Sequence, residues 1–377
     1  MLYRRVILPA SLLVLGLLAA NHSLGQKVSQ EPLNCDASGA IHVHSRFSDG
    51  SGTVEEIAQA ANAAHLDFVV ITDHNTLAGL KGGKEKRYGS VLVLVGEEVT
   101  PYENHYLALG IEKAVNPEGM TFCGMIRAVR DQGGFGIIAH PFDPGNGYFG
   151  AKPIPWTAWY CKGFDGMEIW SYCWDWGDDA HDKPSAVYFT LNPDAAIDGP
   201  RAQALKKWDE LTAERPVVGI GSLDAHAVIY KGEALTLTVL PYRDVFETVR
   251  THVLLPRPLA EKTAQDKRAI YDAIKKGHCY VSYDYLRNAG GFKFTGQTSS
   301  GLVNMGDSVT ESTVSLSVET PAQGRIRLRR NGMLVLERHG RKLDFRATKR
   351  GAYRIEVALR AQDRFRPWIY SNPIYLR

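Results

Sequence analysis

One unit of sequence sets the pattern of this chain: TVEEIAQAANAAHLDFVVITDHN, residues 53–75. Its first half places apolar residues at helical spacing and acidic residues near the start, which is typical of an amphipathic helix. Its second half is an apolar run that ends in polar residues, as a buried strand does where it meets a loop. The stretch therefore predicts a helix, a buried strand and a polar loop.

The same order of elements recurs along the chain. Residues 121–141 and 201–226 repeat it, each with a glycine or proline break between the helical and the apolar part. Further apolar runs that suit strands fall within residues 91–98, 106–110, 165–170 and 269–283. Alternating helices and buried strands favour parallel strands covered on both faces. About seven such units in roughly 250 residues fit an α/β protein of the TIM-like barrel type.

The pattern changes after residue 288. Three segments then alternate apolar and polar residues, and Asn331 with Gly332 is a strong signal for a two-residue hairpin turn. These segments are residues 312–320, 325–338 and 353–359. We therefore expect the barrel over residues 36–288 and a separate small β-sandwich, with a packing or interaction role, over residues 289–377.

Composition and charge narrow the class of protein. Of the 377 residues, 44% are hydrophobic and 23% are charged, so the chain can bury a sizeable core. Its net charge of +3 is spread over 44 basic and 41 acidic residues. That balance lacks the concentrated positive charge that holds nucleic acid, so we expect a small-molecule substrate instead. The sequence leaves the oligomeric state open.

The amino terminus is predicted to be a targeting segment. Arg4 and Arg5 precede an uncharged run over residues 6–20, which is shorter than the roughly 20 residues that span a bilayer. Small residues before Gln26 fit a cleavage site, so residues 1–25 are expected to be a signal peptide; an uncleaved anchor is the alternative. The mature protein would then be periplasmic or secreted, without a stable membrane span.

Five cysteines raise the question of disulfide pairing, which such a compartment permits. Cys161 and Cys173 flank the segment KGFDGMEIWSY and are candidates for a pair; buried free thiols are the alternative. The spacing of Cys35, Cys123 and Cys279 matches no metal site.

Reactive side chains gather at the ends of the predicted barrel strands, where barrels of this type carry their active sites. His42 and His44 lie two residues apart in a strand and should project to the same side. The groups at such ends are His42, His44, Asp49, His74, Glu98, His105, His140, Asp224 and His226. Buried without partners, such groups would cost several kcal/mol each. We therefore predict that cations neutralise them.

The kinds of side chain indicate which ions these are. Nitrogen and oxygen ligands without thiolate suit Zn²⁺, Mn²⁺ or Fe. Because one site takes about four to six ligands, nine side chains imply two or three divalent ions. Asp73 is expected to hold one imidazole in its tautomer; a tenth ligand is the alternative. The residues predict a di- or trinuclear hydrolase in which metal-bound hydroxide attacks a carbonyl or phosphorus centre, with Asp224 as a candidate proton acceptor.

Five of these segments, in this order, resemble the motifs of the PHP (polymerase and histidinol phosphatase) metallohydrolases. They are HVHSRFSDG (42–50), ITDHN (71–75), GEEVT (96–100), IIAHP (137–141) and GSLDAH (221–226). The resemblance covers roughly residues 36–285 and implies a distorted (β/α)7 barrel, the fold of that family. Within GEEVT, Glu98 matches the family's glutamate better than Glu97 does, because the Val-Thr pair follows it.

The resemblance also implies a division of the ligands among three ions. His42, His44, Glu98 and Asp224 would hold the first ion. Glu98 would bridge to a second ion bound by His105 and His140. Asp49, His74 and His226 would hold the third, although some members of the family have histidine where this chain has Asp49.

Two later segments, WDEL (208–211) and WIYSNPIYL (368–376), resemble the carbaryl-hydrolase-like (CehA/McbA-type) subgroup of that family, as does the predicted export. This likeness implies cleavage of carboxyl or carbamate esters, while the wider family cleaves phosphate esters. The alternative is a catalytically inactive ligand-binding barrel with an interaction sandwich. It predicts missing ligands, and none of the nine is missing.

Tryptophan is concentrated in one stretch. Residues 155–189 hold five of the seven tryptophans of the chain, partly in a segment that follows a barrel strand. Trp174 and Trp176 are spaced to face one side of an extended segment, so we expect them to bind an apolar or aryl part of the substrate. Packing of the segment against the barrel or the sandwich is the alternative.

Overall fold

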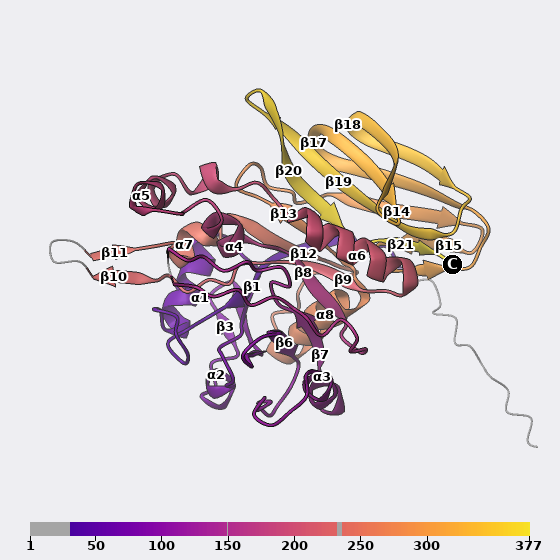
Figure 1. Cartoon of the computed structure of the whole chain (residues 1–377). Helices are drawn as coiled ribbons and strands as arrows, with labels where there is room; N and C mark the ends of the chain where they lie inside the picture. The colour runs from indigo at the N-terminus through magenta and orange to yellow at the C-terminus, as the bar shows by residue number, and fades with distance from the viewer. Residues whose placement is uncertain (1–30, 149, 232–235) are drawn as a thin grey trace, which may run out of the picture.

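The computed structural model describes residues 31–148, 150–231 and 236–377. The predicted signal peptide, residues 1–25, lies outside the described residues. Within the described ranges, no helix is both long and apolar enough to cross a membrane. The described chain has a mixed α/β fold (Figure 1).

The first helix–strand unit forms as its sequence predicts. After β1 (Cys35–Val43), α1 (Val54–Ala63) leads into β2 (Phe68–Ile71). The Thr53 hydroxyl accepts the N–H of Glu56 at 3.2 Å, and the Glu56 carboxylate accepts the N–H of Thr53 at 2.7 Å. This reciprocal cap satisfies the amides at the start of α1. The helix then buries its apolar stripe, and every residue of β2 is buried.

The remaining elements before residue 288 are helices and short strands, and they do not alternate regularly. The helices are α2 (Ala78–Lys81), α3 (Phe122–Asp131), α4 (Tyr172–Gly177), α5 (Lys183–Leu191), the 3-10 helix η1 (Pro193–Ala196), α6 (Ala202–Glu214), α7 (Tyr242–Val245) and α8 (Thr263–Lys276). The strands are β3 (Arg87–Tyr88), β4 (Val91–Val95), β5 (Glu97–Val99), β6 (Tyr106–Leu109), β7 (Phe135–Ile138), β8 (Gly166–Ser171), β9 (Val218–Ser222), β10 (Ile229–Lys231), β11 (Thr236–Thr238), β12 (Val249–Leu255) and β13 (Cys279–Tyr283).

These strands belong to a large sheet and to a five-stranded sheet in the order β5-β6-β7-β8-β9; β10 and β11 pair only with each other. Pairing is parallel for β1–β2, β2–β4, β7–β8 and β8–β9, but antiparallel for β5–β6 and β6–β7 and on both sides of β12. The expectation of parallel pairing therefore holds for four strand pairs and was wrong for the others. The short connection from β5 to β6 explains one case, because a parallel crossover needs about a dozen residues or more.

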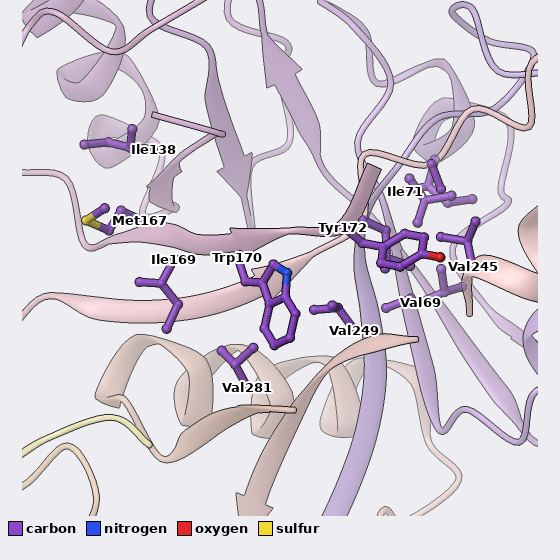
Figure 2. Close-up of a cluster of buried hydrophobic side chains, with 14 of the residues drawn as sticks. Val69, Ile71, Ile138, Met167, Ile169, Trp170, Tyr172, Val245, Val249 and Val281 are labelled. Atoms are coloured by element: carbon purple, nitrogen blue, oxygen red, sulfur yellow. The ribbon is translucent and has the colours of Figure 1, made fainter. Parts of the chain in front are cut away.

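Two isolated bridges join the sheets where regular pairing stops. Val43 at the end of β1 pairs with Ala225, and His74 after β2 pairs with Glu98 in β5. The strand pairing does not close the sheets into one barrel. The distorted (β/α)7 barrel expected from the sequence is therefore not confirmed. Between the sheets, apolar side chains from β2, β8, β12 and β13 form one buried cluster. In Figure 2, Val249 and Val281 lie beside the ring of Trp170, and Val69 and Ile71 lie near Tyr172.

The C-terminal strands continue the large sheet. They are β14 (Lys293–Thr298), β15 (Gly301–Asn304), β16 (Ser308–Val309), β17 (Val314–Arg330), β18 (Met333–Ala347), β19 (Gly351–Ala361), β20 (Arg364–Ser371) and β21 (Ile374–Leu376). The predicted turn at Asn331 and Gly332 joins β17 to β18. Because β20 pairs with β13, these strands share a sheet with β1, and a separate β-sandwich is not confirmed. The boundary near residue 288 stays a prediction.

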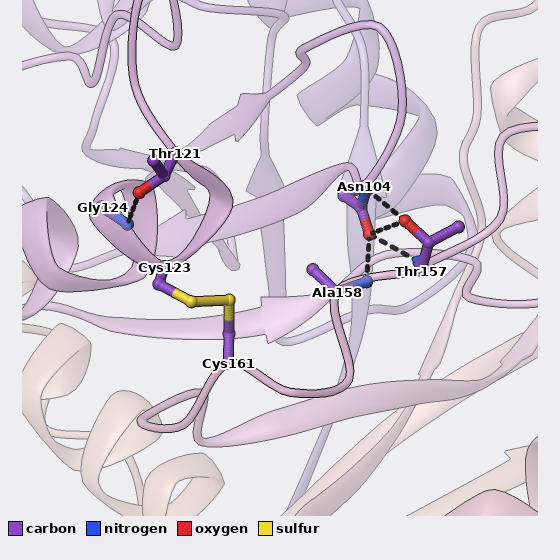
Figure 3. The surroundings of a disulfide bond; sticks show 7 residues. All are labelled: Asn104, Thr121, Cys123, Gly124, Thr157, Ala158 and Cys161. Carbon is purple, nitrogen blue, oxygen red and sulfur yellow. Dashed lines mark hydrogen bonds between the residues drawn. A yellow bond between two sulfur atoms is a disulfide. The ribbon is translucent and has the colours of Figure 1, made fainter.

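One disulfide is present, and it is not the predicted one. Cys123 in α3 is joined to Cys161, whereas Cys173 in α4 is a free thiol (Figure 3). The correct partner was not visible in the sequence because α3 and the loop around Cys161 meet only after folding. Beside the disulfide, the Asn104 side-chain oxygen accepts the N–H groups of Thr157 and Ala158 at 2.6 and 2.8 Å. The disulfide and these bonds tie the loop to its neighbours.

Candidate metal centre

The centre begins at a distortion of β1. His42 has a φ of 69°, and the pairing of β1 with β2 shifts register between Ile41 and Val43. The rings of His42 and His44 still come together, with centroids 5.1 Å apart. The prediction that both rings point to one side agrees with the structure, but an irregular backbone, and not simple strand alternation, brings them there.

Two further residues of the centre have left-handed backbone conformations. The φ angles are 23° for His140 and 55° for Asp224. For a residue other than glycine, such a conformation costs about 1–3 kcal/mol and persists only where the surroundings impose it. Since glycine would adopt it more easily, histidine and aspartate at these positions indicate that the side chains themselves are needed.

The first group of converging side chains is fully enclosed. His42 Nε2 lies 3.2 Å from both Glu98 Oε2 and Asp224 Oδ1, and His44 Nε2 lies 3.1 Å from Asp224 Oδ1. All four of these atoms are buried and have no hydrogen-bond partner among the described residues. In a tetrahedral site with bonds of about 2.0–2.1 Å, ligand atoms lie about 3.3 Å apart. The donor atoms therefore fit a small divalent cation.

Glu98 connects this group to a second one. Its other oxygen, Oε1, lies 2.9 Å from His105 Nδ1 and 3.2 Å from His140 Nε2. The two carboxylate oxygens thus face two different sets of imidazole nitrogens. That arrangement suits a carboxylate shared between two cations.

A third group lies closer to solvent. Asp49 Oδ1 is 3.2 Å from His226 Nε2, and Asp49 Oδ2 is 3.4 Å from His74 Nε2. His44 joins this group through its second nitrogen, at 3.9 Å from Asp49 Oδ1. The structure thus brings all nine predicted side chains together in three overlapping groups, each able to hold a cation. The shared position of His44 was not anticipated from the sequence.

The buried imidazole of His42 and the carboxylate of Glu98 shift each other's pKa values in opposite directions. Burial opposes charge on His42, but the carboxylates of Asp224, Glu168 and Glu98 hold its pKa well above the usual value. Burial likewise opposes charge on Glu98, yet His42, His105 and His140 hold its pKa well below the usual range. His42 thus also attracts a proton, so a proton and a cation compete for its ring nitrogen.

Glu168 is a member of the surroundings that sequence reasoning missed. Its Oε1 lies 2.7 Å from His42 Nδ1, and its Oε2 accepts the backbone N–H of His140 at 2.7 Å. A carboxylate that accepts the Nδ1–H of His42 leaves Nε2 free for a metal ion. The signal was present in the sequence as a single glutamate inside the apolar strand GMEIW (166–170).

Two other acidic residues, Asp73 and Glu97, lie next to members of the cluster in the sequence but are not part of it. Asp73 was expected to hold an imidazole, which was wrong: it accepts hydrogen bonds from Ser45 N, Ser45 Oγ and Ser48 Oγ, each at 2.7 Å. It therefore orders the loop that carries Asp49. Glu97 accepts the N–H of Val115 at 2.8 Å, and burial raises its pKa to about 7. Glu98, not Glu97, enters the cluster.

The two tryptophans lie beside the centre in different ways. They belong to helix α4, so the expected extended segment was wrong. Trp174 donates its indole N–H to Asp224 Oδ2 at 2.6 Å. Trp176 is only 4% exposed and donates to the carbonyl of Phe189 at 3.1 Å. Both also line a cavity next to Asp224 and His226, but their binding of substrate stays a prediction.

Two solved structures resemble this chain at low identity. A two-domain protein from Bacteroides vulgatus, containing a predicted PHP-like metal-dependent phosphoesterase, is 17% identical, with a TM-score of 0.40 over 92% of this chain and 97% of that one. A putative metal-dependent phosphoesterase from Bifidobacterium adolescentis is 16% identical, with a TM-score of 0.31 over 50% of this chain and 87% of that one.

Sequence comparison gives closer matches in the region of the centre. The PHP domain matches residues 40–127, which hold six of the nine clustered side chains. An uncharacterized protein of Methanocaldococcus jannaschii is 32% identical over 118 residues, which are 28% of this chain and 67% of that protein. A phosphoribosyl 1,2-cyclic phosphate 1,2-diphosphodiesterase of Eggerthella lenta is 37% identical over 92 residues, 22% of this chain and only 34% of that enzyme. The chain therefore belongs to the PHP-domain family of hydrolases.

Proposed function

We propose that this protein hydrolyses phosphate esters that carry an apolar or aryl group, with the help of two or three divalent ions. The observation that carries the proposal is the position of Glu98, whose two oxygens face two sets of imidazole nitrogens. The name of the Eggerthella lenta relative, a diphosphodiesterase, supports phosphate esters as the substrate class. Zinc, manganese and iron are the candidate ions, because the donors are nitrogen and oxygen without thiolate.

Carboxyl or carbamate esters are the second candidate, but the residues that suggested them have other contacts. In WDEL, Trp208 is buried and Asp209 pairs with Arg354 of β19 at 2.6 and 2.7 Å. In WIYSNPIYL, the Asn372 side chain donates to the Gly219 carbonyl at 2.9 Å and accepts its N–H at 2.8 Å. Both segments hold the C-terminal strands to the rest of the chain, so packing accounts for them.

The residues of the centre would divide the work as follows. His42, His44, Glu98 and Asp224 would hold one ion, Glu98, His105 and His140 a second, and Asp49, His74 and His226 with His44 a third. When bound, the ions would activate water for attack and neutralise charge on the phosphoryl oxygens. Within the chain, Glu98 and Asp224 are the proposed catalytic residues.

The surroundings of Asp224 limit its role as a base. One of its oxygens faces His42 and His44, while the other accepts the Trp174 indole N–H. Burial opposes its charge, yet His42, His44 and His226 hold its pKa well below the usual range. A carboxylate this weakly basic suits holding and orienting better than removing a proton.

We also propose that the protein is exported, to the periplasm or outside the cell. The Cys123–Cys161 disulfide supports this, because structural disulfides persist mainly in oxidising compartments. Fractionation of cells that express the full chain, with N-terminal sequencing of the product, tests it. Product found only in the cytoplasm with residues 1–25 intact would contradict it.

The test of function combines metal analysis with a substrate panel. Full-length protein, purified mildly, should contain stoichiometric divalent metal and should hydrolyse an aryl phosphate or a phosphodiester faster than a carboxyl ester or a carbamate. His42→Ala and Glu98→Ala should each abolish turnover. The matched control is His278→Ala, since His278 is also buried but pairs with Asp307 outside the centre.

The outcomes separate enzyme from binding protein. Equal losses of turnover in folded His42→Ala and His278→Ala variants would contradict the assignment of the metal centre. Wild-type protein that binds no metal would favour the inactive ligand-binding alternative.

A further inference from the structure

A cavity of about 470 Å³ opens beside the candidate metal centre. Asp49, Asp224 and His226 form its polar end. Its other walls include Trp174 and Trp176 of α4 and four side chains of the β10–β11 hairpin and its base: Val228, Tyr230, Val239 and Leu240. None of the described residues that line it is lysine or arginine. The cavity is therefore ionic at one end and mostly apolar elsewhere.

The hairpin presents one particular face to this cavity. Val228 and Tyr230 both line it, as residues two apart on a strand do when they point the same way. Ile229, between them, does not line it. The exposed fractions are 47% for Val228, 44% for Ile229 and 47% for Tyr230, so burial does not distinguish the two faces. In Figure 1 the hairpin extends away from the main sheets, and β10 and β11 pair only with each other.

Large exposed apolar side chains next to a polar centre call for a reason. They would be better placed in a core unless a ligand covers them, and apolar patches rimmed by polar groups mark binding grooves. The volume is adequate, because a cavity of about 150 Å³ already holds benzene. An aryl ring together with a phosphoryl group therefore fits in the space between the hairpin and Asp224.

We infer that the Val228–Tyr230 face of the β10–β11 hairpin binds the apolar substituent of the substrate and so selects phosphate esters of aryl or other hydrophobic alcohols. The inference rests on the proposed function and adds the part of the molecule that decides specificity. The charged phosphoryl group belongs at the end formed by Asp49, Asp224 and His226, where the cations would lie. The uncharged substituent then contacts Tyr230 and Val228, and Trp174 is also part of the cavity wall.

The kinetic test compares two substrates that differ only in the substituent. Full-length protein with Mn²⁺ is assayed on 1-naphthyl phosphate and on methyl phosphate, as wild type and as Tyr230→Ala, Val228→Ala and Ile229→Ala. Tyr230→Ala should lower kcat/KM for naphthyl phosphate by about tenfold, through KM, and leave methyl phosphate unchanged, because only lost apolar contact separates them. Ile229→Ala, the matched control, should change neither.

A binding test is independent of turnover. Phenylphosphonate and methylphosphonate have a P–C bond in place of the P–O–C link and so are not hydrolysed. They are titrated by calorimetry into the same four proteins. Wild type and Ile229→Ala should prefer phenylphosphonate, and Tyr230→Ala should lose most of that preference. Because Tyr230 is about half exposed, its replacement should leave folding intact, which circular dichroism checks.

The two proposals fail in different ways. If metal-loaded wild type hydrolysed neither phosphate ester, the phosphoesterase proposal would be overturned. The preference of each variant for phenylphosphonate over methylphosphonate would still decide the inference about the hairpin. Equal effects of Tyr230→Ala on both ligands, or equal effects of Tyr230→Ala and Ile229→Ala, would overturn the inference and leave the proposed function standing.

Discussion

At the scale of single residues, the centre depends on a side chain outside it. Glu168 contacts both His42 and His140 at 2.7 Å. Glu168→Gln keeps the shape but removes the charge that holds the His42 tautomer, so we expect metal affinity to fall by about 10–100-fold. Competition titration with a chelator measures this. Glu97→Gln is the matched control, since Glu97 is buried beside Glu98 but faces Val115; equal loss in both variants would contradict the role of Glu168.

A second residue, His252 in β12, is expected to contribute to the stability of the fold and not to the reaction. Its ring lies 2.8 Å from Asp36 and 3.4 Å from Asp284, and it stacks on Tyr280. Burial opposes its charge, but the two carboxylates raise its pKa to about 9. The folded pKa of His252 lies above its unfolded value near 6.5. The interaction of charged His252 with Asp36 and Asp284 therefore stabilises the fold fully below about pH 6.5, and this contribution is lost as pH rises through about 9.

The expected loss is up to about 3 kcal/mol in the free energy of unfolding between pH 6 and pH 9.5. Urea unfolding at the two pH values measures it. The difference between wild type and His252→Gln isolates this residue from the histidines of the centre. If the pH dependence of His252→Gln matched that of wild type, His252 would not carry the effect.

At the scale of elements, α3 and the loop that follows β7 are held by a covalent link. The Cys123–Cys161 disulfide closes a loop with a sequence separation of 38. A crosslink over such a loop stabilises the fold by roughly 3–4 kcal/mol through the entropy of the unfolded chain. Cys123→Ser with Cys161→Ser should therefore lower the free energy of unfolding by about that amount.

Denaturant unfolding measures this loss, and dithiothreitol should lower the stability of the wild type but not of the double variant. Cys173→Ser is the control for loss of a partly buried sulfur without loss of a link, because Cys173 is a free thiol. Identical stability of the double variant and the wild type would show that the crosslink contributes nothing.

At the scale of the whole molecule, the centre lies where the two sheets meet. The isolated bridges Val43–Ala225 and His74–Glu98 are part of this junction, and the clustered side chains project from both sheets. The C-terminal strands supply no member of the cluster, all of which precede residue 227. Among their contacts with the rest of the chain, the guanidinium of Arg354 in β19 pairs with Asp209 in α6. Their contribution should therefore be to stability and not to metal binding.

Arg354→Ala tests that division. It leaves the Asp209 carboxylate without its partner in a largely buried place, so it should cost about 3–5 kcal/mol in the free energy of unfolding. Bound metal, measured by mass spectrometry, should not change. Arg350→Ala, at an exposed position, is the control. Loss of metal from folded Arg354→Ala would show that the C-terminal strands support the centre after all.

Much of the local structure and the membership of the cluster was predictable from the sequence. The helix Val54–Ala63 with its buried stripe, the strand after it and the turn at Asn331 and Gly332 depend on neighbouring residues, whose spacing the sequence displays directly. The nine side chains were also predictable, because each lies at or near an end of an apolar strand, where folds of this type collect their reactive groups.

Only the tertiary structure decided which distant groups meet. It paired Cys123 with Cys161, turned Asp73 toward Ser45, placed Glu168 behind His42 and put Trp174 against Asp224. It also made β5, β6 and β7 antiparallel and joined the C-terminal strands to β13. These contacts link residues that are far apart in the chain, and their energies depend on how whole elements pack. Local spacing carries no record of that packing, whereas the chemical type and position of each side chain are properties of the sequence alone.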